Sequence, residues 1–163
     1  MRTWEHATAR DADEIMRLYR AAANAGRKTG RSDWDDEYPD AENIAGDLEQ
    51  RGLYVVREHG RILAAISLVS PEDIDGLGIS WTPADAREAC RFCLSPELQG
   101  RGHGERLFRM ALALAKAQGI EAVRYLCAKA NPAAFRLYTR MGHRRLEDAV
   151  SWGTEFYSFE VLL

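Results

Sequence analysis

Residues 94–105 read LSPELQGRGHGE, and this stretch decides how the rest of the chain is interpreted. Glycines occupy three alternate positions in it, Gly100, Gly102 and Gly104. An apolar, strand-like run over residues 92–94 enters the stretch, and residues 107–115 leave it with apolar side chains at helical spacing. The pattern predicts a strand, a glycine loop and a helix. Glycines let a backbone approach a ligand closely, and the first helical turn offers unpaired N–H groups to an anion, so this stretch predicts a phosphate or pyrophosphate site.

The spacing of these glycines excludes two common nucleotide-binding motifs. A GxGxxG dinucleotide motif counted from Gly100 needs a glycine where the chain has Glu105. A GxxxxGK[ST] phosphate loop needs a glycine–lysine pair, and the sequence contains none. The pattern that remains is QxxGxG, from Gln99 to Gly104.

Length and composition indicate one globular domain over residues 1–163. The chain is 46% hydrophobic and 29% charged, which suits a sizeable core. A net charge of −3 gives no global electrostatic reason to bind nucleic acid or an anionic membrane. The first residues contain no apolar signal segment, and no uncharged run approaches the roughly 20 residues that cross a bilayer. We therefore expect a cytoplasmic protein.

The three cysteines are predicted to be reduced thiols. Cys90 and Cys93 form a CxxC pattern that invites a metal or redox interpretation. They lie in a strand-like run, where residues three apart point to opposite faces, so burial as small hydrophobic side chains is the preferred interpretation. The four histidines are not spaced as ligands, and no metal site is expected.

Periodicity and turn residues predict an α+β sandwich. Helices are expected over residues 11–23, with Asp11 as the cap, after Asp40, from the glycine loop to about residue 118, and from Asn131 to about Gly142. Strands are expected over residues 3–7, 53–58, 61–69, 88–94, 122–128, 143–150 and 154–163, with connections over 24–39 and 70–85. The strand–helix–strand order around the glycine loop implies a right-handed parallel crossover.

A second motif follows in residues 131–143, NPAAFRLYTRMGH. On a helix that starts at Pro132, the positions Asn131, Ala134, Tyr138 and Met141 recur at spacings of three and four, so they share one side. QxxGxG resembles the acyl-CoA pyrophosphate loop of GNAT acetyltransferases, and residues 131–143 are similar to that family's NxxAxxxYxxxGF pattern, with His143 in place of phenylalanine. The resemblance implies the GNAT fold: a mixed, mostly antiparallel sheet of six or seven strands, about four flanking helices, and a parallel pair that splays at the acyl-CoA site.

The resemblance also implies a cofactor, acetyl-CoA, with CoA as the product. Strand backbone would contact its pantetheine arm, loop amides its pyrophosphate, and Arg101 would add a charge-assisted contact. The expected cofactor-binding residues are Phe92, Cys93, Leu94, Gln99, Gly100, Arg101, Gly102, His103, Gly104, Glu105, Asn131 and Tyr138. Tyr138 is the expected general acid, because a phenol can protonate a departing thiolate. The alternative for Tyr138 is an aromatic side chain packed on a helix face.

A carboxylate is expected to take the proton of the acceptor amine. Glu88 lies on the strand that leads to the cofactor, as a glutamate base does in some branches of the family. The alternative for Glu88 is a solvated strand start or an ion-pair partner. A backbone N–H near Leu94 can polarise the thioester carbonyl.

The acceptor is predicted to be a cationic small-molecule amine. Residues 34–40, WDDEYPD, gather carboxylates and aromatic rings, both of which attract cations. The expected substrate residues are Trp34, Asp35, Glu37, Tyr38 and Trp81. The alternative is a solvated loop whose aromatic side chains plug the core. The tryptophan and Tyr-Pro spacing is similar to that of a group of small bacterial acetyltransferases.

Two other functions compete with this interpretation. One is a non-catalytic acyl-CoA-binding or sensor domain, and the other is an acetyltransferase for protein or peptide amines. A nucleotide-binding module is disfavoured by the failed motifs. An exposed sheet edge would also suit a homodimer.

Overall fold

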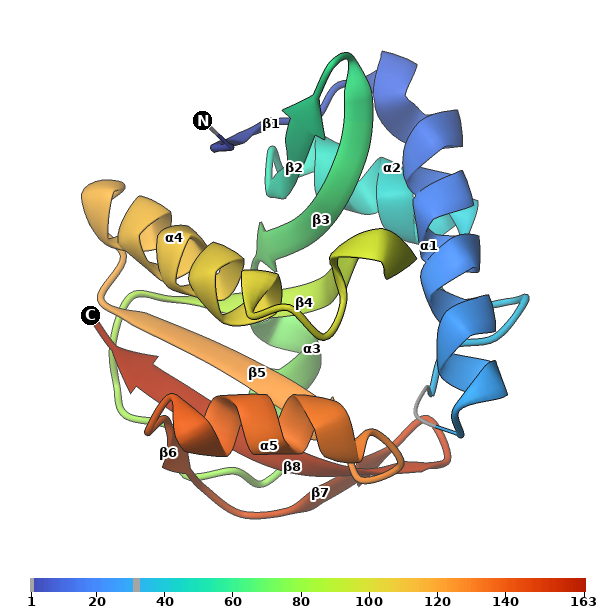
Figure 1. Ribbon diagram of the computed structural model, residues 1–163. Coiled ribbons are helices and arrows are strands. Elements are labelled where there is room, and N and C mark those ends of the chain that lie inside the picture. Colours follow the sequence, from blue (N-terminus) through green and yellow to red (C-terminus); the bar gives the residue numbers. More distant parts are fainter. Residues whose placement is uncertain (1, 31–32) are drawn as a thin grey trace.

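A computed structural model describes residues 2–30 and 33–163, which form one mixed sheet with helices packed on its faces (Figure 1). The strands are β1 (Trp4–His6), β2 (Leu53–Glu58), β3 (Arg61–Val69), β4 (Ala86–Leu94), β5 (Ala122–Ala128), β6 (Arg144–Arg145), β7 (Ala149–Ser151) and β8 (Thr154–Leu162). The helices are α1 (Ala12–Lys28), α2 (Ala41–Glu49), α3 (Glu72–Asp75), α4 (His103–Ala117) and α5 (Pro132–Arg140), with 3-10 turns η1 (Ala9–Asp11) and η2 (Pro96–Leu98).

The sheet has the order β1-β2-β3-β4-β5-β8-β6, and β7 pairs with β8. Its described strand pairs are antiparallel except for β4 and β5, which are joined by the crossover through α4. The parallel pairing runs from Ala86–Ala122 to Glu88–Arg124, and the described residues form no further pairs beyond that point. The predicted α+β sandwich with a splayed parallel pair is confirmed.

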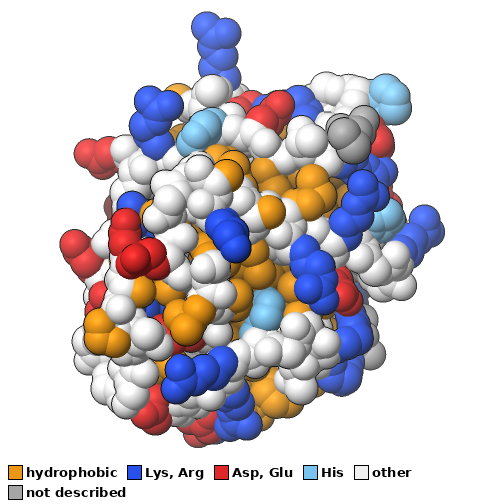
Figure 2. Space-filling view, turned by 90° about the vertical axis from the view of Figure 1, so that its left-hand side faces the viewer, with side chains coloured by type: hydrophobic (Ala, Val, Ile, Leu, Met, Phe, Trp, Pro, Cys, Tyr) orange, Lys and Arg blue, Asp and Glu red, His pale blue; other side chains and the backbone are white. Residues whose placement is uncertain are grey.

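Two helical layers enclose the sheet. Phe108 of α4 and Tyr138 of α5 pack with Tyr125 and Phe159 on one face. On the other face, side chains of α1 and α2 pack against β2, β3 and β4. Strand residues alternate between these faces, so Val55 faces α1 and α2 whereas Tyr54 faces α4. Seen from the side of the two chain ends, hydrophobic side chains lie exposed between basic ones (Figure 2).

Several elements differ from the predicted ranges. Helix α1 continues to Lys28 rather than ending at residue 23, because Ala21, Ala22 and Ala23 favour the helix and basic residues suit its last turn. The expected loop over residues 70–85 contains the short helix α3. The segment 143–150 forms two short strands, β6 and β7, which brings the described strands to eight. Residues 31 and 32 lie outside the described residues.

The predicted cap of α1 has another role. Asp11 precedes α1, but its side chain makes no capping bond there with any residue described. Its carboxylate instead accepts a hydrogen bond from the Thr8 N–H at 2.8 Å and one from Arg57 at 3.0 Å. Asp11 therefore closes the preceding 3-10 turn and ties it to β2.

A bulge in β4 overturns the expectation that Cys90 and Cys93 point to opposite faces of the sheet. Cys90 pairs with Ser67 of β3 and Cys93 pairs with Ala65, so three steps along β4 match two along β3. Arg91 takes up the extra residue with a φ of 49°. Cys90 and Cys93 therefore face the same side of the sheet, and the expectation of opposite faces was wrong. Both are free thiols, and burial raises the pKa of each.

The approach of Gly52 to β3 yields a test of this packing. A Cβ atom at Gly52 would lie 2.3 Å from the carbonyl oxygen of Leu68. Gly52→Ala should therefore lower the free energy of unfolding by about 2–3 kcal/mol, because backbone atoms would have to move. Gly46→Ala is the control: its Cβ would meet no atom of the described residues within 4 Å. In the helix interior it should stabilise by about 0.5–1 kcal/mol. Urea denaturation measures both, and equal stability of Gly52→Ala and wild type would contradict the close approach.

Candidate functional site

The strands β4 and β5 form a wedge, which we call the β4–β5 wedge: the facing edges of residues 89–94 and 125–128. On their outer edges, β4 pairs with β3 as far as Leu94 and β5 pairs with β8 as far as Ala128. On their inner edges, pairing among the described residues stops at Glu88 and Arg124. Backbone N–H and C=O groups along the wedge therefore face a gap, where an extended ligand with its own amides can pair with them.

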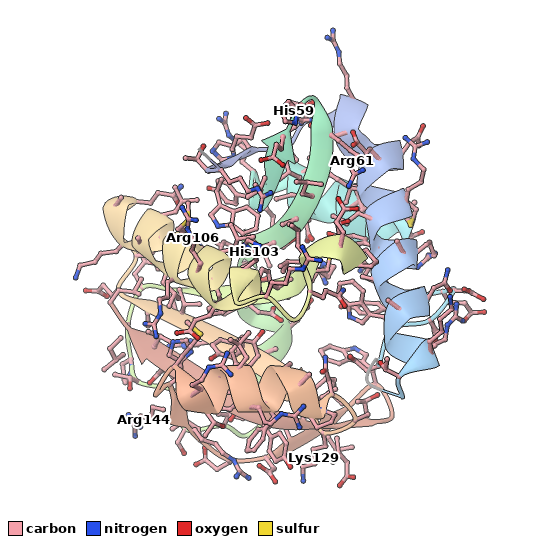
Figure 3. All side chains as sticks on the ribbon, viewed as in Figure 1. His59, Arg61, His103, Arg106, Lys129 and Arg144 are labelled. Carbon is pink, nitrogen blue, oxygen red and sulfur yellow. The ribbon has the colours of Figure 1, made fainter. Side chains whose placement is uncertain are left out.

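The glycine loop follows the end of β4. Gly100 and Gly102 adopt positive φ angles of 71° and 78°, and α4 begins at His103. Figure 3 shows His103 at this end of α4 and Arg106 on the same helix. A Cβ at Gly100 or Gly102 would meet no described atom within 4 Å, and one at Gly104 would meet Leu137 at 3.8 Å. Open space in front of a helix N-terminus fits a pyrophosphate group.

Two side chains of the loop are engaged with the protein itself. The Gln99 side-chain amide donates to the carbonyl oxygen of Leu94 at 3.1 Å, which ties the loop to the end of β4. The Glu105 carboxylate accepts hydrogen bonds from Arg109 at 2.9 Å and from Arg140 at 3.1 Å. These bonds, that of Arg109 first, lower the pKa of Glu105. Glu105 can therefore contribute its backbone N–H to the loop while its charge is neutralised.

Asn131 and Tyr138 lie at the two ends of α5. The Asn131 side chain caps this helix by accepting a hydrogen bond from the Ala134 N–H at 3.2 Å. Tyr138 is 8% exposed, and its ring centroid lies 4.5 Å from that of Tyr125 and 5.2 Å from that of Phe108. The cap and the ring contacts fix the orientation of the Tyr138 side chain at the β5 side of the wedge.

The surroundings of Tyr138 keep its hydroxyl protonated. Burial raises the pKa of Tyr138, and the neighbouring Cys127 and Asp33 raise it further. A phenol in such a place retains its proton at neutral pH, so it is present there as a proton donor. Asp33 also raises the pKa of Cys127, so this residue of the α1–α2 segment lies near the carboxyl end of β5.

His143 fits the aromatic cluster around Tyr138. Its Nδ1 atom shares a hydrogen bond with the Tyr125 hydroxyl, and its ring is stacked with that of Tyr138 at 6.4 Å. Burial, with a smaller effect of Arg109, lowers the pKa of His143 to about 4. The residue is therefore a neutral imidazole at physiological pH, which explains how it replaces a phenylalanine in an apolar environment.

Glu88 lies on the face of the sheet opposite to Tyr138. It is half-buried, and its charged neighbours are Arg91 on β4, Asp47 on α2, and Asp73 and Asp75 on α3. Burial raises the pKa of Glu88 to about 7; Arg91 lowers it and the three aspartates raise it. A carboxyl group with this pKa can accept a proton near neutral pH. The β4–β5 wedge separates this group from the Tyr138 hydroxyl.

A family model for the Acetyltransferase (GNAT) family matches residues 12–143, which is most of the chain. The chain belongs to the GNAT acetyltransferase family. The matched region contains the wedge, the glycine loop, Glu88 and Tyr138. No curated protein sequence matches this GNAT family member.

Solved structures share the GNAT fold at low sequence identity. A GNAT acetyltransferase from Streptococcus agalactiae 2603 is 18% identical, with a TM-score of 0.80 over 99% of this chain and 95% of that one. PaiA N-acetyltransferase from Thermoplasma acidophilum, in complex with coenzyme A, is 15% identical, with a TM-score of 0.73 over 100% and 99%. YncA from Salmonella typhimurium, with acetyl-CoA, is 20% identical, with a TM-score of 0.70 over 100% and 94%. These likenesses establish the fold.

The predicted acceptor residues of this GNAT protein have varied surroundings. Trp34 packs edge-on against Tyr19, with ring centroids 5.4 Å apart. Asp35 accepts hydrogen bonds from the N–H groups of Glu37 and Tyr38, both at 2.8 Å, so its carboxylate shapes the loop. The Glu37 side chain is exposed. Tyr38 accepts a hydrogen bond from Arg91 and is 39% exposed.

Trp81 lies apart from residues 34–38, on the segment between α3 and β4. The guanidinium of Arg124 lies 5.5 Å from its ring centroid, and its indole N–H reaches the Ile74 carbonyl oxygen at 3.4 Å. Arg124 also binds the Asp75 carboxylate at 2.9 Å and the Thr82 carbonyl oxygen at 2.6 Å. Trp81 is therefore part of a polar network that fastens this segment across β5.

Sequence reasoning overlooked three residues around the GNAT site, namely Asp33, Asp47 and Arg91. Asp47 occurs three positions after Ile44 on the buried side of α2, and Arg91 interrupts the apolar run of β4. A charged residue at a position that periodicity assigns to the core was the available signal for these two. Asp33 carried no such signal, because it lies in a polar connection.

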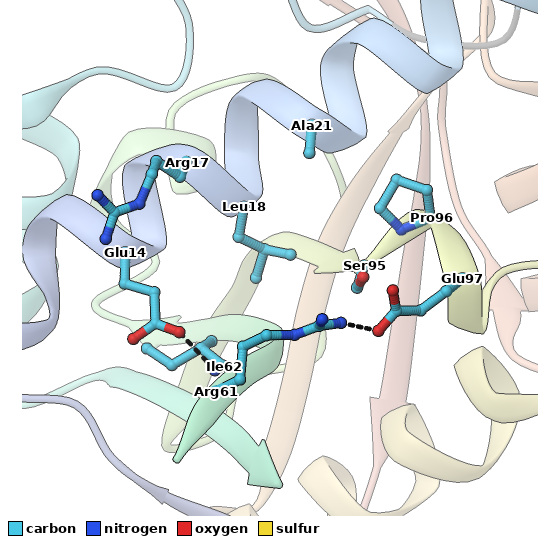
Figure 4. Close-up of a pocket in the computed structure, with 9 residues that line it drawn as sticks. All are labelled: Glu14, Arg17, Leu18, Ala21, Arg61, Ile62, Ser95, Pro96 and Glu97. Atoms are coloured by element: carbon cyan, nitrogen blue, oxygen red, sulfur yellow. Dashed lines mark hydrogen bonds and ion pairs between the residues drawn. The ribbon is translucent and has the colours of Figure 1, made fainter. Parts of the chain in front are cut away.

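Among the described residues, two of the hollows on the protein lie outside the wedge. The larger, of about 370 Å³, lies between α1 and η2 and is bordered by the Arg61–Glu97 ion pair and by Glu14, whose carboxylate accepts a hydrogen bond from the Ile62 N–H (Figure 4). It contains none of the residues that surround Glu88 or Tyr138. The smaller, of about 210 Å³, is lined by Asp47, Asp73 and Arg91. These three are also neighbours of Glu88, so the smaller hollow is the one associated with the site.

The raised pKa of Glu88 predicts how folding stability depends on pH. The folded protein binds the Glu88 proton more tightly than the unfolded chain, whose ordinary pKa is 4.5. This contribution to stability is therefore fully present below pH 4.5 and is lost as the pH rises to about 7. The melting temperature of Glu88→Gln minus that of wild type should therefore be more positive at pH 8 than at pH 5, as measured by calorimetry.

The control for this experiment is Glu105→Gln. Its lowered pKa places any pH dependence below the ordinary value of 4.5, so its difference from wild type should be the same at pH 5 and pH 8. A Glu88→Gln difference that is equally flat would show that Glu88 titrates normally.

Proposed function

We propose that this protein is an acetyl-CoA-dependent N-acetyltransferase that transfers the acetyl group directly to a primary amine. The observation that carries the proposal is the β4–β5 wedge, with the glycine loop at the end of β4, a protonated phenol on one side and a carboxyl group with a pKa of about 7 on the other. The coenzyme A and acetyl-CoA bound by PaiA and YncA support the same cofactor.

The chain offers a suitable donor set for this cofactor. Backbone groups of Phe92, Cys93 and Leu94 would pair with the amides of the pantetheine arm, beside Asn131. The N–H groups from Gly100 to Glu105, including that of His103, would hold the pyrophosphate, with Arg101 adding charge. Gln99 supports the loop through its bond to Leu94. When bound, acetyl-CoA supplies the acetyl group in activated form, as a thioester.

The protein would contribute two proton-transfer groups and close positioning. Glu88 would accept a proton from the acceptor amine at its carboxylate, directly or through water. Tyr138 would donate its hydroxyl proton to the departing sulfur, and an N–H near Leu94 would bind the carbonyl oxygen. Holding amine and thioester together can by itself remove roughly 7–11 kcal/mol from the barrier.

The preferred acceptor is a cationic small-molecule amine. The four carboxyl groups of Glu88, Asp47, Asp73 and Asp75 outnumber the two guanidinium groups, of Arg91 and Arg124, that pair with Asp47 and Asp75, and this excess of negative charge raises the local concentration of protonated amines. Tyr38, which is partly exposed, and Glu37 extend this acidic and aromatic surface. Trp34 and Asp35 would support it from within the loop, and Trp81 would border it through its contact with Arg124.

Cofactor binding is tested by calorimetry with CoA and with the variant Gly104→Ala. Wild type should bind CoA well below 1 mM, and absence of binding at 1 mM would refute the proposal. In the unliganded protein Gly104→Ala is sterically free, so its melting temperature should equal or exceed that of wild type. Its CoA affinity should fall about tenfold or more, equivalent to about 1.4 kcal/mol, because the methyl group would stand where the pyrophosphate approaches. Unchanged affinity would show that Gly104 is not part of the pyrophosphate site.

Catalysis is tested with a panel of amines, including polyamines, amino acids and peptides, by the release of free thiol from acetyl-CoA. A cationic small molecule should be the best substrate. Tyr138→Phe should lower turnover roughly 100-fold with little change in CoA affinity. Unchanged turnover would remove Tyr138 from the mechanism. Preference for peptides would favour the protein acetyltransferase, and CoA binding without any thiol release would favour the non-catalytic binder.

A further inference from the structure

A buried ion pair joins α2 to the bulge of β4. Arg91 donates from Nε and Nη2 to the two carboxylate oxygens of Asp47, both at 2.7 Å. Asp47 is 3% exposed and also accepts a hydrogen bond from the Ser67 hydroxyl of β3. The remaining terminal nitrogen of Arg91 donates to the Tyr38 hydroxyl at 3.2 Å. The guanidinium is therefore held by two separate segments of the chain.

The same arginine has an unfavourable backbone conformation. Its φ of 49° lies in the left-handed region, which a residue with a Cβ avoids inside a strand. Such a conformation persists only where surrounding contacts determine it. The bidentate bond to Asp47 supplies those contacts, at the part of β4 that no longer pairs with β5. A bulge also bends its strand and increases the local twist.

The pair is among the groups that face Glu88. These groups are Arg91 and Cys90 from β4, Asp47 from α2, Asp73 and Asp75 from α3, Tyr38 from the α1–α2 segment, and Arg124, the register partner on β5. Arg124 is bound to Asp75, the Thr82 carbonyl oxygen and Glu160. Among the neighbouring charges Arg91 acts most strongly on Glu88, and Asp47 acts in the opposite sense.

We propose that the Asp47–Arg91 ion pair is a positioning device for acetyl transfer, which holds the β4 bulge that opens the wedge and fixes the charges that face the Glu88 carboxyl group. Neither residue need touch the substrate. The inference rests on the proposed function only in taking Glu88 as the base, and it concerns residues that the sequence motifs of the site do not include.

The charge part of the proposal is tested by the titration of Glu88 in two single variants. Arg91→Met should raise the midpoint of the Glu88 carboxyl resonance by about one pH unit, and Asp47→Asn should lower it by a comparable amount. Both variants break the same ion pair, so loss of structure alone would move the midpoint in one direction in both. Carbon-13 NMR measures it without substrate, with the resonance identified by its absence in Glu88→Gln and that of Glu105 as the unaffected reference.

Two further variants complete the test. The first serves if the single variants fail to fold, and the second tests the role of the bulge. The neutral double variant Asp47→Asn/Arg91→Met leaves no unpaired buried charge, and its midpoint should lie between those of the single variants. Arg91→Lys keeps the charge but loses the bidentate bond, so the midpoint should stay near the wild-type value while kcat falls about tenfold. Wild-type kcat in Arg91→Lys would overturn the positioning role of the bulge.

The outcomes separate this inference from the proposed function. Shifts in the same direction, or no shift, in Arg91→Met and Asp47→Asn would overturn the electrostatic role of the pair. Full turnover in Glu88→Gln would instead refute Glu88 as the base, while the NMR midpoints would still decide whether the pair controls the charge environment of that carboxyl group.

Discussion

The separation of β4 and β5 after three paired residues is the constraint on which the rest of the structure depends. A regular parallel pair would satisfy its backbone groups internally and leave nothing for a ligand. Here the strands pair at Glu88 and then diverge, so each satisfies only its outer edge. The helices α4 and α5 cover one side of the resulting gap, and α1 and α2 pack on the other face of the sheet (Figure 1). The wedge is thus a surface of backbone groups held open by the packing around it.

The two titratable groups of the site show how burial can support different chemistry on the two faces of one sheet. Tyr138 stands in an aromatic cluster, where burial disfavours the phenolate and preserves a proton donor. Glu88 stands among aspartates and one strongly bound arginine, where burial brings its pKa to about 7 and leaves a proton acceptor. The acid and the base that we propose thus have, near neutral pH, the protonation states that proton transfer requires.

Polar networks hold the segments that lie across the sheet. Glu160, 1% exposed, accepts hydrogen bonds from the N–H and hydroxyl of Thr82 and pairs with Arg124. Together with the stacking of Trp81 on Arg124, this network fixes the segment between α3 and β4. Asp47 and Arg91 hold α2 in the same manner. The charges of Asp47 and Arg91, and those of Arg124 and Glu160, are paired, which limits the ways these segments can move relative to β4 and β5.

The sequence by itself determined most of the local elements and supplied the two motifs on which the proposed site is built. Strands 53–58, 61–69 and 122–128 follow from apolar, β-branched runs between turn residues, and each occurs as predicted. Residue spacing also predicted the glycine loop, the helix cap at Asn131 and the position of Tyr138 on α5. Each of the two motifs involved is short, so its geometry is set by the local backbone. These features all depend on residues that are close together in the sequence.

Only the tertiary structure decided what lies around Glu88. The β4 bulge places Cys90 and Cys93 on one face, against the alternation expected of a strand. The bulge involves distant contacts, namely the pairing of β4 with β3 and the hydrogen bonds between Arg91 and Asp47, so strand alternation could not predict it. The approach of Asp33 to Tyr138 likewise joins residues about a hundred positions apart. Periodicity indicates which face of an element is apolar, but it does not indicate which distant side chain packs against that face. The pKa of Glu88 depends on such distant side chains.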